Sequence, residues 1–185
     1  MYNNKGLTLI EVMIVITFIT ILASLAAPSF SNILRRQQVR GEADILFSLV
    51  YLARSEAIKR NKVVTICKSD DGMVCGGSWS DGWIVFADSD KDGSRDNEEI
   101  LILSGSVGGG YRLEWTAFGS NNYIRFTQNG LTLSQNGSFK LCPSDNDVRF
   151  ARTVVISKTA RVRLPKDSDG NGIFEGARNN DLTYN

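Results

Sequence analysis

An unbroken apolar run lies near the start of the chain. Residues 7–27 contain one charged residue, Glu11, and their only other polar members are threonine and serine. Because a helix rises about 1.5 Å per residue, a run of this length covers roughly 30 Å, the thickness of a bilayer core. The pattern predicts a membrane-spanning helix over residues 7–28, preceded by a short polar leader at residues 1–6.

Beyond Pro28 the apolar positions become periodic. They recur at spacings of three and four, the pattern of one buried face on an amphipathic helix, and the other face carries polar residues such as Arg40 and Glu56. We therefore expect residues 29–61 to continue the helix and to pack one stripe against a sheet. The stripe consists of Val39, Ala43, Leu46, Val50, Ala53 and Ala57.

After Asn61 the sequence changes to short runs rich in β-branched and aromatic residues, separated by Gly, Asp and Asn. A long helix followed only by short strands predicts an α+β fold in which the helix covers antiparallel β-sheets. The β-rich globular domain is expected over residues 62–185. Its predicted strands are 63–68, 83–87, 100–103, 111–115, 123–127, 139–142, 153–157 and 161–164.

The apolar run can be interpreted in several ways, and Glu11 is the residue that helps to choose among them. A cleaved secretory signal would end at the small residues Ser24-Leu25-Ala26, but the run is longer than a usual signal core. A plain membrane anchor explains the length and leaves the carboxylate unexplained, since a charge inside a membrane costs about 3 kcal/mol and usually has a partner. The arginines at 35, 36 and 40 also fit poorly with a simple positive-inside orientation.

A third interpretation accounts for these features together. Lys5-Gly6-Leu7-Thr8-Leu9-Ile10-Glu11 resembles the processing site of type IV prepilins, although Leu7 stands where phenylalanine is usual. The resemblance implies that prepilin peptidase cuts between Gly6 and Leu7, that the new amine is methylated, and that Glu11 meets the N-terminal amine of a neighbouring subunit. Pro28 also lies where members of the family often have a proline. The implied location is the bacterial inner membrane, single-pass with a periplasmic C-terminal domain, followed by incorporation into a filament.

Four later segments make the resemblance specific to one branch of these proteins. LARSEAIKRN, VTICKSDDGMVC, GWIVFADSDKDG and ISKTARVRL occur in the order seen in the GspH/FimT branch of minor pilins and pseudopilins. Membership implies a type IV pilin-like fold and a low-abundance subunit that primes or caps a filament, with other minor pilins and the major pilin as partners. The resemblance leaves open whether the filament is a type IV pilus (FimT or FimU type) or a type II secretion pseudopilus (GspH type).

Catalysis is not expected from this composition. The sequence contains no histidine, which removes the usual general base, the common nucleophile pairs and the commonest zinc ligand. No nucleophile or phosphate-loop motif is present either. We therefore expect a protein that is not an enzyme and needs no cofactor.

Three cysteines allow three different single bridges in an exported domain: Cys67, Cys75 and Cys142. Cys67 and Cys75 flank a segment with Asp70, Asp71 and Gly72 that is typical of a turn. We favour the bridge that closes this short loop, while free thiols in a reducing compartment are the alternative.

An acidic segment fits the calcium-loop pattern D-x-D-x-D-G-x5-E. Asp88, Asp90, Asp92 and Glu99 are its candidate ligands, and residues 88–99 hold six acids and two bases, a net charge of −4. The flanks are predicted strands instead of the helices of an EF-hand, so a solvated acidic hairpin is the alternative. A second segment starting at Asp167 begins the same pattern but has arginine in the final position, which favours a tight turn.

The last third of the chain is basic. Residues 140–166 contain seven basic and two acidic residues, a net charge of +5. Thr159–Arg163 resembles the Gly-Arg-x-Arg stretch linked to DNA binding in FimT-type competence pilins, with Ala160 in place of the glycine. Phosphate contacts of this kind would bind double-stranded DNA without sequence preference, and a solvated basic edge strand is the alternative. The candidate residues are Arg152, Lys158, Arg161, Arg163 and Lys166.

Overall fold

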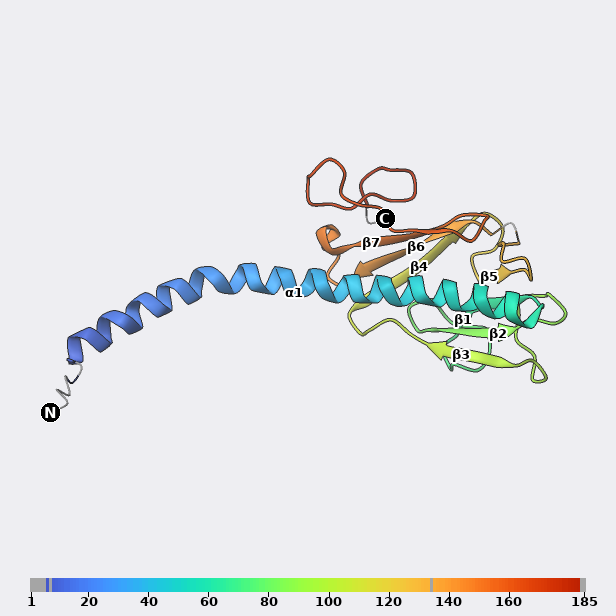
Figure 1. Ribbon diagram of the computed structural model, residues 1–185, viewed down its shortest axis with the longest axis horizontal. Helices are drawn as coiled ribbons and strands as arrows, with labels where there is room; N and C mark the ends of the chain where they lie inside the picture. The colour runs from blue at the N-terminus through green and yellow to red at the C-terminus, as the bar shows by residue number, and fades with distance from the viewer. Residues whose placement is uncertain (1–5, 7, 134, 184–185) are drawn as a thin grey trace. The chain divides into compact units, whose positions relative to one another are not determined.

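The structure is a computed structural model that describes residues 6, 8–133 and 135–183. The chain divides into two compact units, Met1–Gln38 and Val39–Asn185. The first is entirely helical from Leu9 onward, and the second combines the end of the same helix with two antiparallel sheets (Figure 1). This confirms the predicted α+β fold.

A single helix, α1, runs from Leu9 to Arg60. The helix is continuous through Pro28, a residue type that permits a kink. The helix ends at Asn61, whose φ of 52° is the left-handed conformation that commonly stops a helix. In the last turns Arg60 Nε lies 2.6 Å from Glu56 Oε2, a pairing at i and i+4 that supports the helix.

Eight strands follow in two four-stranded sheets, and each matches one of the predicted runs. The first sheet has the order β3-β2-β1-β5, and the second has the order β4-β6-β7-β8. All pairings are antiparallel. The strands are β1 Val64–Lys68, β2 Trp83–Ala87, β3 Leu101–Gly105, β4 Tyr111–Ala117, β5 Tyr123–Phe126, β6 Gly137–Pro143, β7 Arg152–Ile156 and β8 Val162–Arg163, with a 3-10 turn, η1, at Val148–Phe150.

One core joins the helix to both sheets in the second unit. All six residues of the predicted stripe, from Val39 to Ala57, are buried, and they share a hydrophobic cluster with Ile66 and Phe126 of the first sheet and Phe139 of the second. In Figure 1 this part of α1 runs along both sheets. The helix is therefore held by tertiary packing of its apolar face, as the periodicity predicts.

A C-terminal segment without regular secondary structure, residues 164–183, covers part of the second sheet. Leu182 and the half-buried Phe174 pack against the buried Cys142 and Ala151 in a separate hydrophobic cluster. This layer could not be predicted from the sequence, because the segment has no strand or helix periodicity. The segment also contacts two of the basic residues, Arg152 and Arg163.

Candidate functional site

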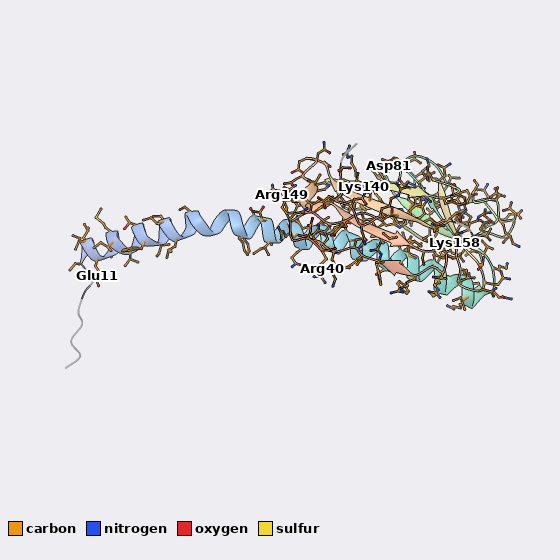
Figure 2. The ribbon with its side chains drawn as sticks, turned by 90° about the horizontal axis from the view of Figure 1, so that it is seen from above. Glu11, Arg40, Asp81, Lys140, Arg149 and Lys158 are labelled. Carbon is orange, nitrogen blue, oxygen red and sulfur yellow. A yellow bond between two sulfur atoms is a disulfide. The ribbon has the colours of Figure 1, made fainter. Side chains whose placement is uncertain are left out.

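The expected processing site and Glu11 lie at the start of α1. Gly6 is exposed, and Leu7 lies outside the described residues. The Thr8 hydroxyl accepts a hydrogen bond from the backbone N–H of Glu11 at 3.4 Å, so Thr8 acts as an N-cap. Glu11 is exposed in the first turn, where a negative charge is favoured by the helix dipole (Figure 2).

An extended apolar surface follows Glu11 on the helix of the first unit. Between Leu9 and Leu34, the large hydrophobic side chains that the structure describes (those outside residues 25–29) are between 42% and 79% exposed in this isolated chain. A soluble monomer rarely exposes a continuous apolar surface of this extent, which marks an interaction site. No helix among the described residues has both the length and the apolar character required of a membrane span. Membrane insertion of residues 7–28 stays a prediction.

The disulfide joins Cys67, on β1, to Cys75, with a Cα–Cα distance of 5.6 Å. It closes the short turn-rich loop, as the sequence predicts, and Cys142 is buried outside this disulfide. Inside the loop Asp71 Oδ1 accepts the backbone N–H groups of Met73 and Val74. These two hydrogen bonds are the main cause of the lowered pKa of Asp71.

Three of the four predicted metal ligands come together in the loop between β2 and β3. Asp88, Asp90 and Glu99 each place a carboxylate oxygen within 4.8 Å of the others. Asp92 does not join this group, and its Oδ1 accepts the backbone N–H of Ser94 at 2.7 Å. Gly93 has a φ of 85°, and a Cβ there would lie 2.6 Å from the Tyr123 ring, so this turn requires glycine.

Asp88 has an unusual environment within that loop. Its side chain is 1% exposed, and its Oδ2 accepts the hydroxyl of Thr65, on β1, at 2.6 Å. Burial raises the pKa of Asp88 above its ordinary value of 3.8, while Thr65, the backbone N–H of Lys91 and the charge of Arg125 act in the opposite direction. Its Oδ1 is buried with no hydrogen-bond partner of acceptable geometry.

The predicted DNA-binding residues divide into two groups. Lys158, Arg161 and Lys166 are exposed. Arg163 is also exposed and Arg152 is half-buried, but both contact the C-terminal segment. The Arg152 guanidinium lies 3.4 Å from the centre of the Phe174 ring, and that of Arg163 donates to the Ala177 carbonyl at 3.3 Å. The strand predicted over residues 161–164 is shorter in the structure, where β8 spans Val162–Arg163 and Arg161 lies just before it.

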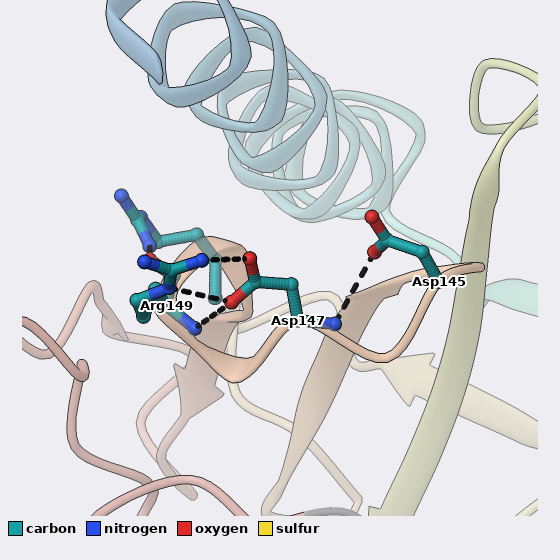
Figure 3. Close-up of polar contacts among 4 residues, drawn as sticks. Asp145, Asp147 and Arg149 are labelled. Atoms are coloured by element: carbon teal, nitrogen blue, oxygen red, sulfur yellow. Dashed lines mark hydrogen bonds and ion pairs between the residues drawn. The ribbon is translucent and has the colours of Figure 1, made fainter. Parts of the chain in front are cut away.

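Two further cations of the basic region also have partners. The Arg149 guanidinium binds Asp147 through two hydrogen bonds, Nε to Oδ1 at 2.9 Å and Nη2 to Oδ2 at 2.6 Å (Figure 3). These bonds raise the pKa of Arg149. Lys140 donates to the Thr183 carbonyl. Figure 2 labels Arg149, Lys140 and Lys158 on the second unit.

Ala160 stands in the position of the glycine in the resembling DNA-binding stretch, and the structure shows a reason why glycine suits it. Ala160 has a φ of 55° in the turn between β7 and β8 and is 1% exposed. A non-glycine residue in this conformation costs about 1–2 kcal/mol. The turn is held by the Ser157 N–H donating to the Arg161 carbonyl at 3.0 Å and the Ala160 N–H donating to the Ser157 carbonyl at 2.9 Å.

Solved structures share this architecture. The minor pilin FimU of Pseudomonas aeruginosa is 19% identical, with a TM-score of 0.55 over 70% of this chain and 89% of that one. The minor pseudopilin EpsH of the Vibrio cholerae type 2 secretion system is 11% identical, with a TM-score of 0.50 over 69% of this chain and 95% of that one. A comparison with curated protein sequences finds no match. The likeness to these structures shows that the fold is that of a type IV pilin-like subunit.

The family follows from two sequence models. The model of the type II transport protein GspH matches residues 42–160, and the model of the prokaryotic N-terminal methylation motif matches residues 1–27. Because the first covers well over half of the chain, the protein belongs to the GspH family, which comprises minor pilins and pseudopilins of GspH/FimT type. Members of these families are structural subunits and not enzymes.

Proposed function

We propose that this chain is a minor subunit that primes or caps a type IV pilus or a secretion pseudopilus. The observation that carries the proposal is the exposed apolar surface of α1 with Glu11 in its first turn. The matched methylation motif, residues 1–27, contains Glu11 and most of this surface. In the filament this surface would be buried among neighbouring helices, which removes the unfavourable free energy of exposing apolar side chains to water.

The proposal assigns separate tasks to the first residues. Prepilin peptidase cuts between Gly6 and Leu7, and the mature chain is held in the inner membrane by residues 7–28 before assembly. The released amine of a neighbouring subunit then meets the Glu11 carboxylate. A charge pair formed as both groups enter an apolar environment offsets the cost of burying either alone and fixes the register between neighbouring helices.

Replacement of Glu11 tests this assignment. Glu11→Ala is expected to abolish incorporation into sheared filaments, because the neighbour's amine would then be buried without a partner. Asp44→Ala is the matched control: Asp44 is an exposed carboxylate on the same helix, within the second unit, so its loss should leave incorporation unchanged.

The readout is the amount of the chain in the filament fraction and in the membrane fraction, by immunoblot. We expect both variants to reach the membrane at the wild-type level and only Asp44→Ala to reach the filaments. Normal filament content of the Glu11→Ala chain would contradict the assembly role.

A second candidate function is DNA binding during uptake, and the exposed cations near the β7–β8 turn favour it. Lys158, Arg161 and Lys166 are all exposed in the same short stretch of chain. Such a site would bind phosphates without reading sequence, and its affinity would fall with salt. The two functions are compatible, because a subunit at the end of a filament meets the medium.

A mobility shift with double-stranded DNA over a salt series tests the second function. Arg161→Ala should weaken binding and flatten its salt dependence. Arg149→Ala is the control, since the Arg149 guanidinium is already held by Asp147. Absence of binding by the wild-type chain at low salt, or equal losses in both variants, would exclude this assignment of the site.

A further inference from the structure

The loop between β2 and β3 brings three carboxylates from distant points of a calcium-type sequence pattern to one place. Oxygens of Asp88, Asp90 and Glu99 lie within 4.8 Å of one another. Residues 88 and 99 stand at the two ends of the loop, directly after β2 and shortly before β3. We propose that this loop binds a calcium ion through Asp88, Asp90 and Glu99.

The buried oxygen of Asp88 is the observation that points to a ligand. The residue is 1% exposed, and its Oδ2 is already satisfied by the Thr65 hydroxyl. Its Oδ1 makes no hydrogen bond of acceptable geometry, although it is shielded from water and belongs to a carboxylate grouped with two others. Buried polar atoms nearly always have a partner, and a cation held between the carboxylates supplies the missing one.

The Glu99 side chain is fixed by the loop in a position to bind metal. Glu99 is 9% exposed, its Oε1 accepts the N–H of Ser89 at 2.6 Å, and its Oε2 accepts the N–H of Asp96 at 3.2 Å. A carboxylate oxygen can accept twice, so each oxygen keeps a lone pair. The two hydrogen bonds therefore orient the carboxylate without using up its capacity as a ligand.

The remaining charge in the loop favours a divalent cation. Residues 88–99 carry a net charge of −4, and Arg125 adds one positive charge beside them through its hydrogen bond to the Lys91 carbonyl, which leaves −3. The loop's own Arg95 donates to the carbonyls of Met73 and Glu99 and not to a carboxylate of the cluster. A calcium ion would neutralise most of the excess.

The ligand chemistry selects calcium over zinc or magnesium. All three candidate side chains offer oxygen, the donor that calcium prefers, and the protein has no histidine. Calcium accepts six to eight oxygens in irregular arrangements, so backbone carbonyls and water can complete its shell. Magnesium requires near-ideal octahedral coordination and loses its bound water reluctantly, so an irregular loop is expected to bind it weakly.

The acidic segment that begins at Asp167 provides an internal contrast. Both carboxylate oxygens of Asp167 accept backbone N–H groups, from Gly170 and Gly172, so this residue closes a tight turn as the sequence predicts. Among the described residues, the carboxylates of this segment do not form a group of three near enough to share an ion. The comparison shows that acidic composition alone does not assemble a site.

Calcium titration of the full-length protein in detergent, by calorimetry after treatment with chelator, tests the proposal. We expect saturable binding with a Kd on the order of 10⁻⁴ to 10⁻³ M, the range of extracellular calcium modules. Asp90→Asn should weaken binding by about tenfold or more, because it removes one charged ligand. Asp90 is exposed, so this variant is expected to fold like the wild-type chain.

Glu98→Gln is the matched control, because Glu98 is an exposed acid in the same loop and lies outside the cluster. It should bind calcium within about twofold of the wild-type chain. No saturable binding up to about 10 mM calcium would overturn the proposal, as that exceeds the weakest range expected of such sites. Equal weakening in Glu98→Gln and Asp90→Asn, or equally tight binding of magnesium, would also overturn it.

Discussion

The charged form of Asp88 is expected to destabilise the domain, because burial disfavours its charge. The carboxylate lies at the end of β2 with one oxygen bonded to Thr65 and the other buried without a partner. Burial raises its pKa, so the folded domain holds the Asp88 proton more tightly than the unfolded chain does. This contribution to stability is fully present below the unfolded-state pKa and is lost as the pH rises through the folded-state pKa.

The pH dependence of stability gives a test at this residue. In the presence of chelator, Asp88→Asn should gain free energy of unfolding relative to the wild-type chain as the pH rises from about 3.5 to 7, because the amide has no charge to bury. Urea unfolding at a series of pH values measures the difference. A difference that stays constant across this range would show that Asp88 has the same pKa in the folded and unfolded chains.

Glu11 and the basic residues show what sequence can and cannot assign to individual side chains. Glu11 stands out in the sequence because it is a carboxylate in an apolar run, and its role in assembly stays a prediction. The contact of Arg163 with the Ala177 carbonyl could not be predicted, because Ala177 lies in a segment without periodicity. A strand pattern predicts which face a residue is on, but it carries no information about what covers that face.

Among the elements, α1 was the most completely predictable from sequence. Its spacing of apolar residues fixes one face, and Val39, Leu46 and Val50 are each 0% exposed. The existence of each strand was also predictable from β-branched runs between turn residues. Strand order was not, since β1 pairs with β5 across a long stretch of chain and such pairings depend on distant packing.

The helix stripe supports a prediction on stability. Leu46→Ala should lower the free energy of unfolding by about 2–5 kcal/mol, because it leaves a cavity between the helix and the sheets. Ile45→Ala is the control: Ile45 is 46% exposed, so its truncation should cost about 1 kcal/mol or less. Urea unfolding monitored by tryptophan fluorescence measures both, and similar losses in the two variants would contradict this account of the core.

The whole molecule combines two units with different surfaces. Val39–Asn185 has its own core, a disulfide and two sheets, whereas the helix of Met1–Gln38 exposes its large apolar side chains in the isolated chain. The family match explains the contrast, since the exposed helix of a filament subunit is completed by its neighbours. Sequence could predict this division, because the apolar run changes to a one-sided stripe after Pro28.

The central claim is that the processed chain is a filament subunit, and intact mass spectrometry of sheared filaments tests it most directly. We predict that the fraction contains this chain at a low ratio to the major subunit, with Leu7 as its methylated first residue and residues 1–6 removed. Detection of the chain only in membranes, or in filaments with its leader still attached, would contradict the account.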